Sequence, residues 1–175
     1  KNNSELKILG AANVANFNCD YEGEFESDTL SFVAKLENNI GHIRGDTLKL
    51  DIDAFDCGRK GINRDLRKTL KYNEFPTIDV SLSKVTLKGS IFDVLKTTIS
   101  IAGIQNDYLL KFDVNKINDD YFQVIGEQKI NMSDFELEAP RAFMGLVRVK
   151  DELTITYNLF IKKRRALSVL ALYRD

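Results

Sequence analysis

The sequence is poor in the residues on which most catalytic and metal sites depend. Its 175 residues include a single histidine, His42, only two cysteines, Cys19 and Cys57, and no tryptophan. A catalytic triad, a histidine-rich metal site or a histidine acid–base pair would have to be built on His42 alone. The sequence contains no GxSxG, HExxH, Walker A or GxGxxG motif. We therefore predict a protein that is not an enzyme and that needs no cofactor and no metal.

Long apolar runs and a dominant charge are also absent. No stretch of about 18 apolar residues is present, so no segment is long enough to span a bilayer as a helix. The 25 basic and 26 acidic residues nearly cancel, which leaves a net charge of −1. Without a basic field, nucleic acid is not an expected partner. Paired carboxylates such as Asp51 and Asp53 fall on one face of a predicted strand, where solvation explains them.

The two cysteines leave two alternatives open. Cys19 and Cys57 match neither a zinc-binding nor a CxxC redox spacing, so they form either a disulfide or a pair of buried thiols. A disulfide would require export to an oxidising compartment. The chain begins at Lys1 without an initiator methionine, and removal of an export signal is one interpretation of that start.

Alternation of apolar and polar residues dominates the chain. In residues 48–53, the side chains of Leu48, Leu50 and Ile52 would share one face of an extended strand. The same period recurs in residues 78–82, 110–114 and 153–161, and less regular strands are expected near residues 17–25, 29–36, 92–102 and 121–132. Turn residues between these segments favour hairpins. The pattern predicts about eight half-buried antiparallel strands.

One segment follows a helical period instead. Ile62, Leu66 and Leu70 fall on a single stripe, which predicts a short helix around residues 62–72, capped by Asn63 or by the 58–61 loop and ending before Pro76. Its outer face carries four basic residues, Arg64, Arg67, Lys68 and Lys71. We interpret them as a solvated surface, with an anionic head-group site as the alternative.

These elements predict a mainly β fold, a single antiparallel β-barrel with one short helix. We assign the barrel to residues 1–165 and a C-terminal apolar extension to residues 166–175. The extension would pack on the barrel or on a neighbouring molecule, or it would dock on a membrane surface through the basic residues before it. The sequence leaves homodimer formation and membrane contact open.

Apolar and aromatic residues at the alternating positions are expected to face the barrel interior. A barrel of about eight strands is either filled by its side chains or wide enough for one elongated ligand, and periodicity does not decide between them. The candidate ligand-binding residues are Phe17, Phe32, Leu50, Val80, Ile101, Leu110, Phe112, Phe122, Val124, Ile155, Tyr157 and Leu159.

Short motifs spread over residues 48–160 decide in favour of the second alternative. They keep one order and spacing: DAFDCG at 53–58, NRD at 63–65, LKYNEFPTI at 70–78, ISIAGI at 99–104, MSDFEL at 132–137 followed by Pro140, and GLVRVKD at 145–151. In this order they resemble the YceI-like family.

The resemblance implies an extended, lipocalin-like barrel exported to the periplasm or secreted. It further implies that the barrel binds and carries an isoprenoid or a similar long-chain amphiphilic lipid in an internal apolar tunnel. A polar head would then lie at a tunnel mouth near Arg64, Lys68, Arg141 or Arg148. The alternative function is that of a packed barrel, which acts as a structural or protein-interaction module without a ligand.

Overall fold

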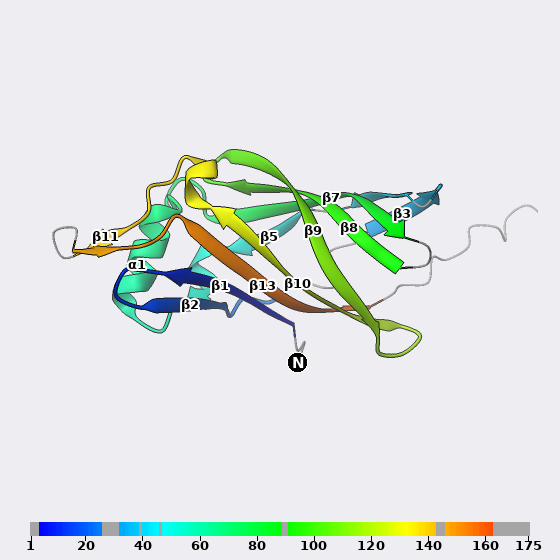
Figure 1. The fold of residues 1–175 in the computed structure, drawn as a ribbon, viewed down its shortest axis with the longest axis horizontal. Coiled ribbons are helices and arrows are strands. Elements are labelled where there is room, and N and C mark those ends of the chain that lie inside the picture. The colour runs from blue at the N-terminus through cyan, green and yellow to red at the C-terminus, as the bar shows by residue number, and fades with distance from the viewer. Residues whose placement is uncertain are drawn as a thin grey trace, which may run out of the picture.

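The computed structural model describes residues 4–25, 32–38, 40–45, 47–88, 91–142 and 146–162. It confirms a mainly β fold with one α-helix (Figure 1). The strands are β1 (Glu5–Ala11), β2 (Asn16–Tyr21), β3 (Phe32–Glu37), β4 (Ile40–Gly45), β5 (Leu48–Asp51), β6 (Phe55–Asp56), β7 (Thr77–Lys88), β8 (Ile91–Ile101), β9 (Ile104–Lys116), β10 (Tyr121–Asn131), β11 (Arg141–Ala142), β12 (Val147–Arg148) and β13 (Glu152–Lys162). The helices are η1 (Ile52–Ala54), α1 (Lys60–Thr69) and η2 (Met132–Phe135).

Eleven strands form one antiparallel sheet in the order β3-β4-β7-β8-β9-β10-β13-β1-β2-β6, with β5 paired to β7. The chain itself connects the two sides of this sheet at one end. β5 pairs with β7, continues through η1 into β6, and β6 pairs with β2. The sheet therefore curls into an extended barrel whose seam is bridged by the chain between β5 and β6.

A disulfide fastens the same seam. The structure joins Cys19 in β2 to Cys57, which directly follows β6, across a Cα–Cα distance of 3.9 Å. Both residues are buried, Cys19 completely. Of the two alternatives that the sequence leaves open, the structure therefore shows the disulfide, and this bond holds β2 and β6 together where only two residue pairs connect them.

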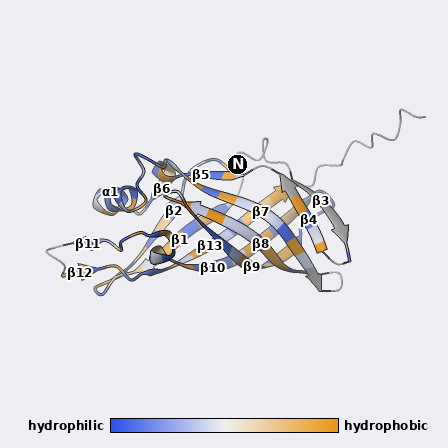
Figure 2. Cartoon of the chain, turned by 90° about the horizontal axis from the view of Figure 1, so that it is seen from above, coloured by the Kyte–Doolittle hydropathy of each residue, from blue (hydrophilic) through white to orange (hydrophobic). Residues whose placement is uncertain are grey.

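All eight predicted strands are present, and β1, β4 and β6 complete the sheet. The expected strand over residues 48–53 is shorter than predicted, because the side chain of Asp51 accepts a hydrogen bond of 2.9 Å from the N–H of Asp53 and begins η1. Ile52 thus lies in a 3₁₀ turn, where it is fully buried. Figure 2 shows hydrophobic and hydrophilic residues alternating along the long strands, as their half-buried character requires.

Helix α1 confirms the predicted stripe. Ile62 and Leu66 pack against the core and Leu70, at the end of the helix, is buried. The N-cap is Arg59, which belongs to the predicted 58–61 loop, whereas Asn63 lies inside the helix. Of the four basic residues, Arg67 forms an ion pair with Asp53 of η1. Nε of Arg64 lies 3.6 Å from Oδ1 of the neighbouring residue Asp65.

Asn63 fastens the helix to the barrel. Its Oδ1 accepts a hydrogen bond of 2.7 Å from the N–H of Cys57, and its Nδ2 donates one of 2.8 Å to Oδ1 of Asp56. The N–H of Gly58 also donates to that oxygen, at 3.0 Å. The hydrogen bond from Asn63, followed by that from Gly58, lowers the pKa of the Asp56 carboxyl below its ordinary value of 3.8. The DAFDCG and NRD motifs therefore build a structural joint.

Replacing Asn63 with alanine tests this joint. We expect Asn63→Ala to lower the free energy of unfolding by about 1 to 3 kcal/mol, because the N–H of buried Cys57 loses its partner. The pKa of Asp56 is lower in the folded protein than in the unfolded chain. The ionised carboxylate therefore stabilises the fold fully at pH values above its ordinary pKa, and this contribution is lost as the pH falls through the lower pKa of the folded state. The difference in the free energy of unfolding between Asn63→Ala and the natural sequence, measured by urea unfolding, should therefore become smaller at acidic pH.

Asn18 provides a matched control for this test. Its Nδ2 donates a hydrogen bond of 3.0 Å to Asp20, but this pair is exposed to solvent. Asn18→Ala removes the same kind of asparagine–aspartate contact and should cost little at any pH. Equal losses in the two variants would contradict the role of Asn63 as a buried joint.

The packed core fills one end of the barrel. Ile52 of η1, Leu70 after α1, and Met132 and Phe135 of η2 belong to a buried cluster together with inward residues of the sheet, such as Ile8. Figure 1 shows α1 and β11 at this end, and β3 with the β9–β10 turn at the other. The short helices therefore close one end of the barrel, which we call the plugged end.

Two predictions concern the ends of the chain and the membrane. The C-terminal extension predicted over residues 166–175 lies outside the described residues, as do residues 163–165. In the described part of the chain, no helix combines the length and the apolar character that crossing a membrane requires.

Candidate functional site

The pairing register decides which side chains share the inner face of the sheet, since residues paired across antiparallel strands point to the same side. Leu6 and Ile8 of β1, both buried in the core, pair with Tyr157 and Ile155 of β13. Starting from these two pairs, the pairing of each strand with its neighbour identifies the inward-facing residues of every long strand. We call a set of residues paired across successive strands a row. Across β13, β10 and β9, for example, one row joins Leu159, Val124 and Val114.

The described candidate residues all lie on this inner face, but they fall into two groups. Leu50 and Ile101 are core residues, and Phe17, Val80, Ile155 and Tyr157 pack against that core. Five others lie on the inner face outside the core cluster: Leu110, Phe112, Phe122, Val124 and Leu159. Phe32 lies in β3, and its side chain is not among those that the structure describes.

The second group extends to inward residues that the sequence analysis did not single out. Leu82 of β7, Leu95 of β8 and Val114 of β9 continue the same face outside the core cluster. We call the combined set the open-half lining: Leu82, Leu95, Leu110, Phe112, Val114, Phe122, Val124 and Leu159. Leu110 is 9% exposed and the others are half-buried, so this apolar wall remains within reach of solvent. Leu82 and Val114 already stood in the alternating segments of the sequence, where the signal for them was available.

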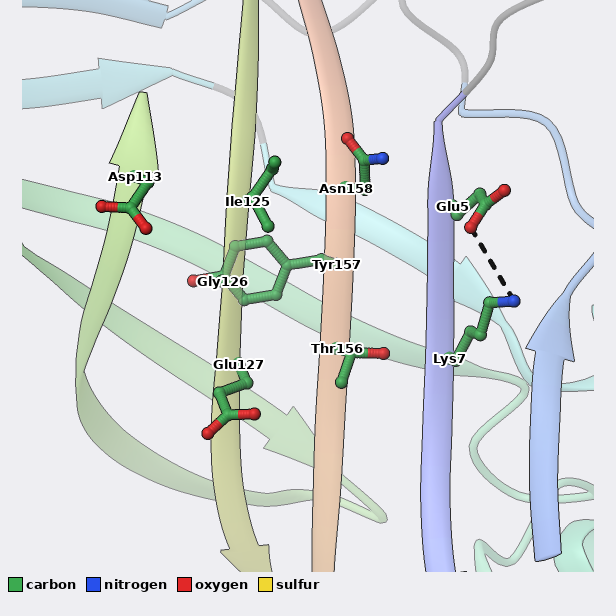
Figure 3. A pocket seen from close by; sticks show the side chains of 9 residues that line it. All are labelled: Glu5, Lys7, Asp113, Ile125, Gly126, Glu127, Thr156, Tyr157 and Asn158. Atoms are coloured by element: carbon green, nitrogen blue, oxygen red, sulfur yellow. Dashed lines mark ion pairs between the residues drawn. The ribbon is translucent and has the colours of Figure 1, made fainter. Parts of the chain in front are cut away.

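Tyr157 lies where the core meets the open-half lining. Its ring lies across Gly126 of β10, where a Cβ atom would approach the Tyr157 oxygen to 2.3 Å (Figure 3). Only glycine leaves room for the ring, and the hydroxyl donates a hydrogen bond of 3.3 Å to the carbonyl of Lys111 in β9. Burial raises the pKa of this phenol, so it stays protonated at neutral pH. Tyr157 thus links the middle of β13 to the middle of β10 and β9.

A separate depression of about 360 Å³ lies on the outer face of β1, β13, β10 and β9. Its charged residues are Glu5, Lys7, Asp113 and Glu127. Nζ of Lys7 lies 3.7 Å from Oε2 of Glu5, and Figure 3 marks this ion pair with a dashed line. The pKa of Lys7 is raised, first by its hydrogen bond to Asp20, so its charge is already compensated. Of the sequence-predicted candidate residues it contains Tyr157 alone, and its remaining residues, apart from Gly126, point away from the inner face.

The four basic residues proposed near a tunnel mouth lie at the plugged end. Arg64 and Lys68 belong to α1, while Arg141 of β11 and Arg148 of β12 are paired across a two-stranded ribbon. Figure 1 places α1 and β11 together, away from the β9–β10 turn. The short helices fill the barrel at that end, so these cations are separated by the core from the open-half lining.

His42, the single histidine of the sequence, lies exposed in β4. No group of three or more histidine, cysteine, aspartate or glutamate side chains in the described ranges is placed to hold a metal ion. The arrangement that these ranges do show is a half-buried apolar wall on the inside of a barrel.

Several solved protein structures resemble this architecture. The chain resembles Burkholderia cenocepacia BcnA, with a TM-score of 0.69, 16% identity, and coverage of 90% of this chain and 95% of that one. It resembles a polyisoprenoid binding domain from Saccharophagus degradans implicated in plant cell wall breakdown, with a TM-score of 0.60, 10% identity, and coverage of 92% and 94%. A Campylobacter jejuni YceI protein follows, with a TM-score of 0.59, 14% identity, and coverage of 83% and 86%.

Among curated proteins, none matches the sequence. At these identities the solved structures establish the shared fold alone. The model of the YceI-like domain, however, matches residues 3–160, which is nearly the whole barrel. The chain belongs to the YceI-like family.

Proposed function

We propose that this protein binds an isoprenoid or a similar long-chain amphiphilic lipid along the open-half lining and carries it outside the cytoplasm. The observation that carries the proposal is the division of the inner face. Residues at the plugged end form a packed core, whereas the eight residues of the open-half lining lie outside that cluster and all of them except Leu110 are half-buried. Apolar side chains that face inward without joining the core provide a surface for an apolar ligand.

The affinity would come from burial. Each methylene removed from water contributes about 0.8 kcal/mol, so a chain of several isoprene units could bind at micromolar concentrations or below after association costs. Such a site selects by shape and length, because the lining supplies dispersion contacts along the whole chain.

The end opposite α1 would be the entrance. The β9–β10 turn and the end of β13 carry exposed apolar side chains there, with Ile117 at 54%, Tyr121 at 40% and Ile161 at 49% exposure. Ile161 pairs with Phe122 of the lining, so the apolar surface continues from the rim inward. An amphiphilic chain could therefore enter beside these residues, with Lys116 of β9 in the same row as Phe122 and Ile161.

Two further observations support the proposal. The S. degradans neighbour is a polyisoprenoid binding domain, which gives a precedent for this ligand class on this fold. The Cys19–Cys57 disulfide is expected to persist in an oxidising compartment, which favours the periplasm or secretion.

Native mass spectrometry of the purified protein, followed by organic extraction, tests the proposal. We expect an adduct of defined mass that is released into the organic phase as a lipid. A protein that is isolated empty and also fails to bind added isoprenoid alcohols, quinones and fatty acids would overturn it. That result would favour a packed module that interacts with other proteins.

A further inference from the structure

A group of exposed residues lies at the end of the barrel opposite α1. The sheet pairs Ile161 of β13 with Phe122 of β10 in one row. In the next row it pairs Lys162 with Tyr121. The carbonyl of Tyr121 accepts a hydrogen bond of 3.0 Å from the N–H of Ile117, which brings the start of the β9–β10 turn beside them (Figure 1). We call the exposed residues of this group the rim cluster: Lys116, Ile117, Tyr121, Ile161 and Lys162.

The rim cluster has the composition of a protein surface that contacts a lipid bilayer. Tyrosine is enriched at the level of the lipid head groups, and lysine keeps its ammonium group in the polar layer while its stem covers apolar surface. Lys162 holds its Nζ 5.6 Å from the centre of the Tyr121 ring, so these two side chains form one amphipathic unit. Ile117 and Ile161 add two apolar side chains that are about half exposed. This combination matches the boundary between head groups and acyl chains.

The charge at the rim favours an anionic bilayer. Within the rim cluster, Nζ of Lys116 lies 2.6 Å from Oδ1 of Asp119, so this cation is compensated. Lys162, in contrast, begins a run of four basic residues over positions 162–165. The chain advances at most about 3.5 Å per residue, so residues 163–165 lie within about 10 Å of Lys162. Each cation near an anionic bilayer strengthens binding by about fivefold.

We propose that the rim cluster docks the barrel on the surface of an anionic lipid bilayer, with the open end toward the membrane. This inference rests on the proposed function and deepens it, because it names the surface from which the lipid comes or to which it goes. An isoprenoid chain would pass between the acyl layer and the open-half lining beside Ile161 and Phe122. Its methylenes would then cross from one apolar environment to another without full exposure to water.

A second copy of the chain would cover the rim cluster less well than a bilayer. In a two-fold dimer the same patch meets itself, so the basic run of one copy would approach the basic run of the other. Like charges placed across an interface lower its affinity. The rim cluster is also small, whereas a stable protein interface takes about 20 to 30 residues from each partner. Anionic lipids attract the basic run, and a bilayer contact gains free energy in proportion to the apolar area buried.

The absence of tryptophan from the chain allows a single one to be introduced as a probe of depth. Tyr121→Trp places it in the rim cluster. Leu109→Trp places it on the outer face of β9, where Leu109 is 66% exposed, and Leu146→Trp places it beside β12 at the plugged end, where Leu146 is 75% exposed. Each variant is mixed with vesicles of phosphatidylcholine and phosphatidylglycerol that carry brominated acyl chains. We expect the bromine atoms to quench the fluorescence of Tyr121→Trp alone.

Binding to unlabelled vesicles, measured by flotation, gives the energetic test. Ile117→Glu should weaken binding to vesicles with phosphatidylglycerol by about tenfold or more, because it removes an apolar contact and adds a charge that the anionic lipids repel. Leu109→Glu is the matched control, since it adds the same charge at an exposed apolar position outside the rim cluster. It should bind as the natural sequence does. Equal melting temperatures of the two variants would show that both keep the fold.

The role of charge is tested with the lipid composition. Vesicles of phosphatidylcholine alone should bind the natural sequence at least about tenfold more weakly than vesicles that contain phosphatidylglycerol, and added salt should reduce that difference. Substitution of residues 163–165 by serine in the full chain should lower the affinity for the anionic vesicles toward the value for phosphatidylcholine. Equal affinity of the natural sequence for both kinds of vesicle would overturn the preference for an anionic bilayer.

Other results would assign the contact elsewhere and overturn the inference. Quenching of Leu146→Trp would place the membrane at the plugged end. Vesicle binding without quenching of any of the three tryptophans would mean that residues 163–175 bind alone. A dimer in analytical ultracentrifugation that Ile117→Glu dissociates would show that a second copy covers the rim cluster.

Vesicle docking and lipid binding are measured separately, so the two proposals fail separately. A natural sequence that binds isoprenoid alcohols in solution but not the anionic vesicles would overturn the docking and leave the proposed function in place. One that docks through Tyr121 but takes up none of the added lipids would support the docking and overturn the proposed function.

Discussion

Removal of the Cys19–Cys57 disulfide is expected to lower the free energy of unfolding by about 4 kcal/mol. The bond spans 38 positions of the chain, and closing a loop of that length in the unfolded state accounts for this amount. For a protein of this size the loss corresponds to a fall in melting temperature of about 8 to 16 °C. The double variant Cys19→Ala with Cys57→Ala, compared with the natural sequence by calorimetry, measures it.

The location of the bond explains why its loss should be felt by the whole barrel. β6 holds β2 through two residue pairs, and the disulfide is the covalent reinforcement of that seam. Reducing agent should reproduce the effect in the natural sequence and leave the double variant unchanged. If the natural sequence melts at the same temperature with and without reductant, the seam does not depend on the bond.

Strand alternation predicted most of the sheet, and local chemistry explains where it failed. β4 was missed because Gly41 suggested a turn, although pairing with β3 and β7 overrides the low strand propensity of glycine. In β1 the period is short and is obscured by Leu9, an apolar residue that is 38% exposed on the outer face. Ile52 left the predicted strand because Asp51 caps the following turn with its own side chain.

The inner face of the site could be predicted, but its division into core and lining could not. Val80 and Val124 occupy equivalent positions in alternating strands, yet only Val80 packs against the core. The difference arises from η2 and α1, which fill one end of the barrel, and periodicity carries no information on that tertiary contact.

A substitution that fills the open-half lining should separate a hollow barrel from a packed one. Val124 is half-buried, points inward between Val114 and Leu159, and lies outside the core cluster. In Val124→Trp the indole would occupy the space of two or three methylenes of a bound chain. At about 0.8 kcal/mol for each methylene, the affinity for an isoprenoid alcohol should fall by about 10- to 50-fold.

Ile125→Trp is the matched control, because Ile125 is the next residue, 37% exposed on the outer face. It should leave lipid affinity unchanged. Stability supplies the second discriminating measurement, since a large side chain forced into a packed core costs about 1 to 3 kcal/mol, whereas one placed in a hollow costs far less. Loss of lipid binding in Val124→Trp with an unchanged melting temperature would support the carrier. The opposite result would be a strong loss of stability in Val124→Trp but not in Ile125→Trp, with no change in lipid binding. It would mean that the open-half lining is packed and that the protein acts through its surface.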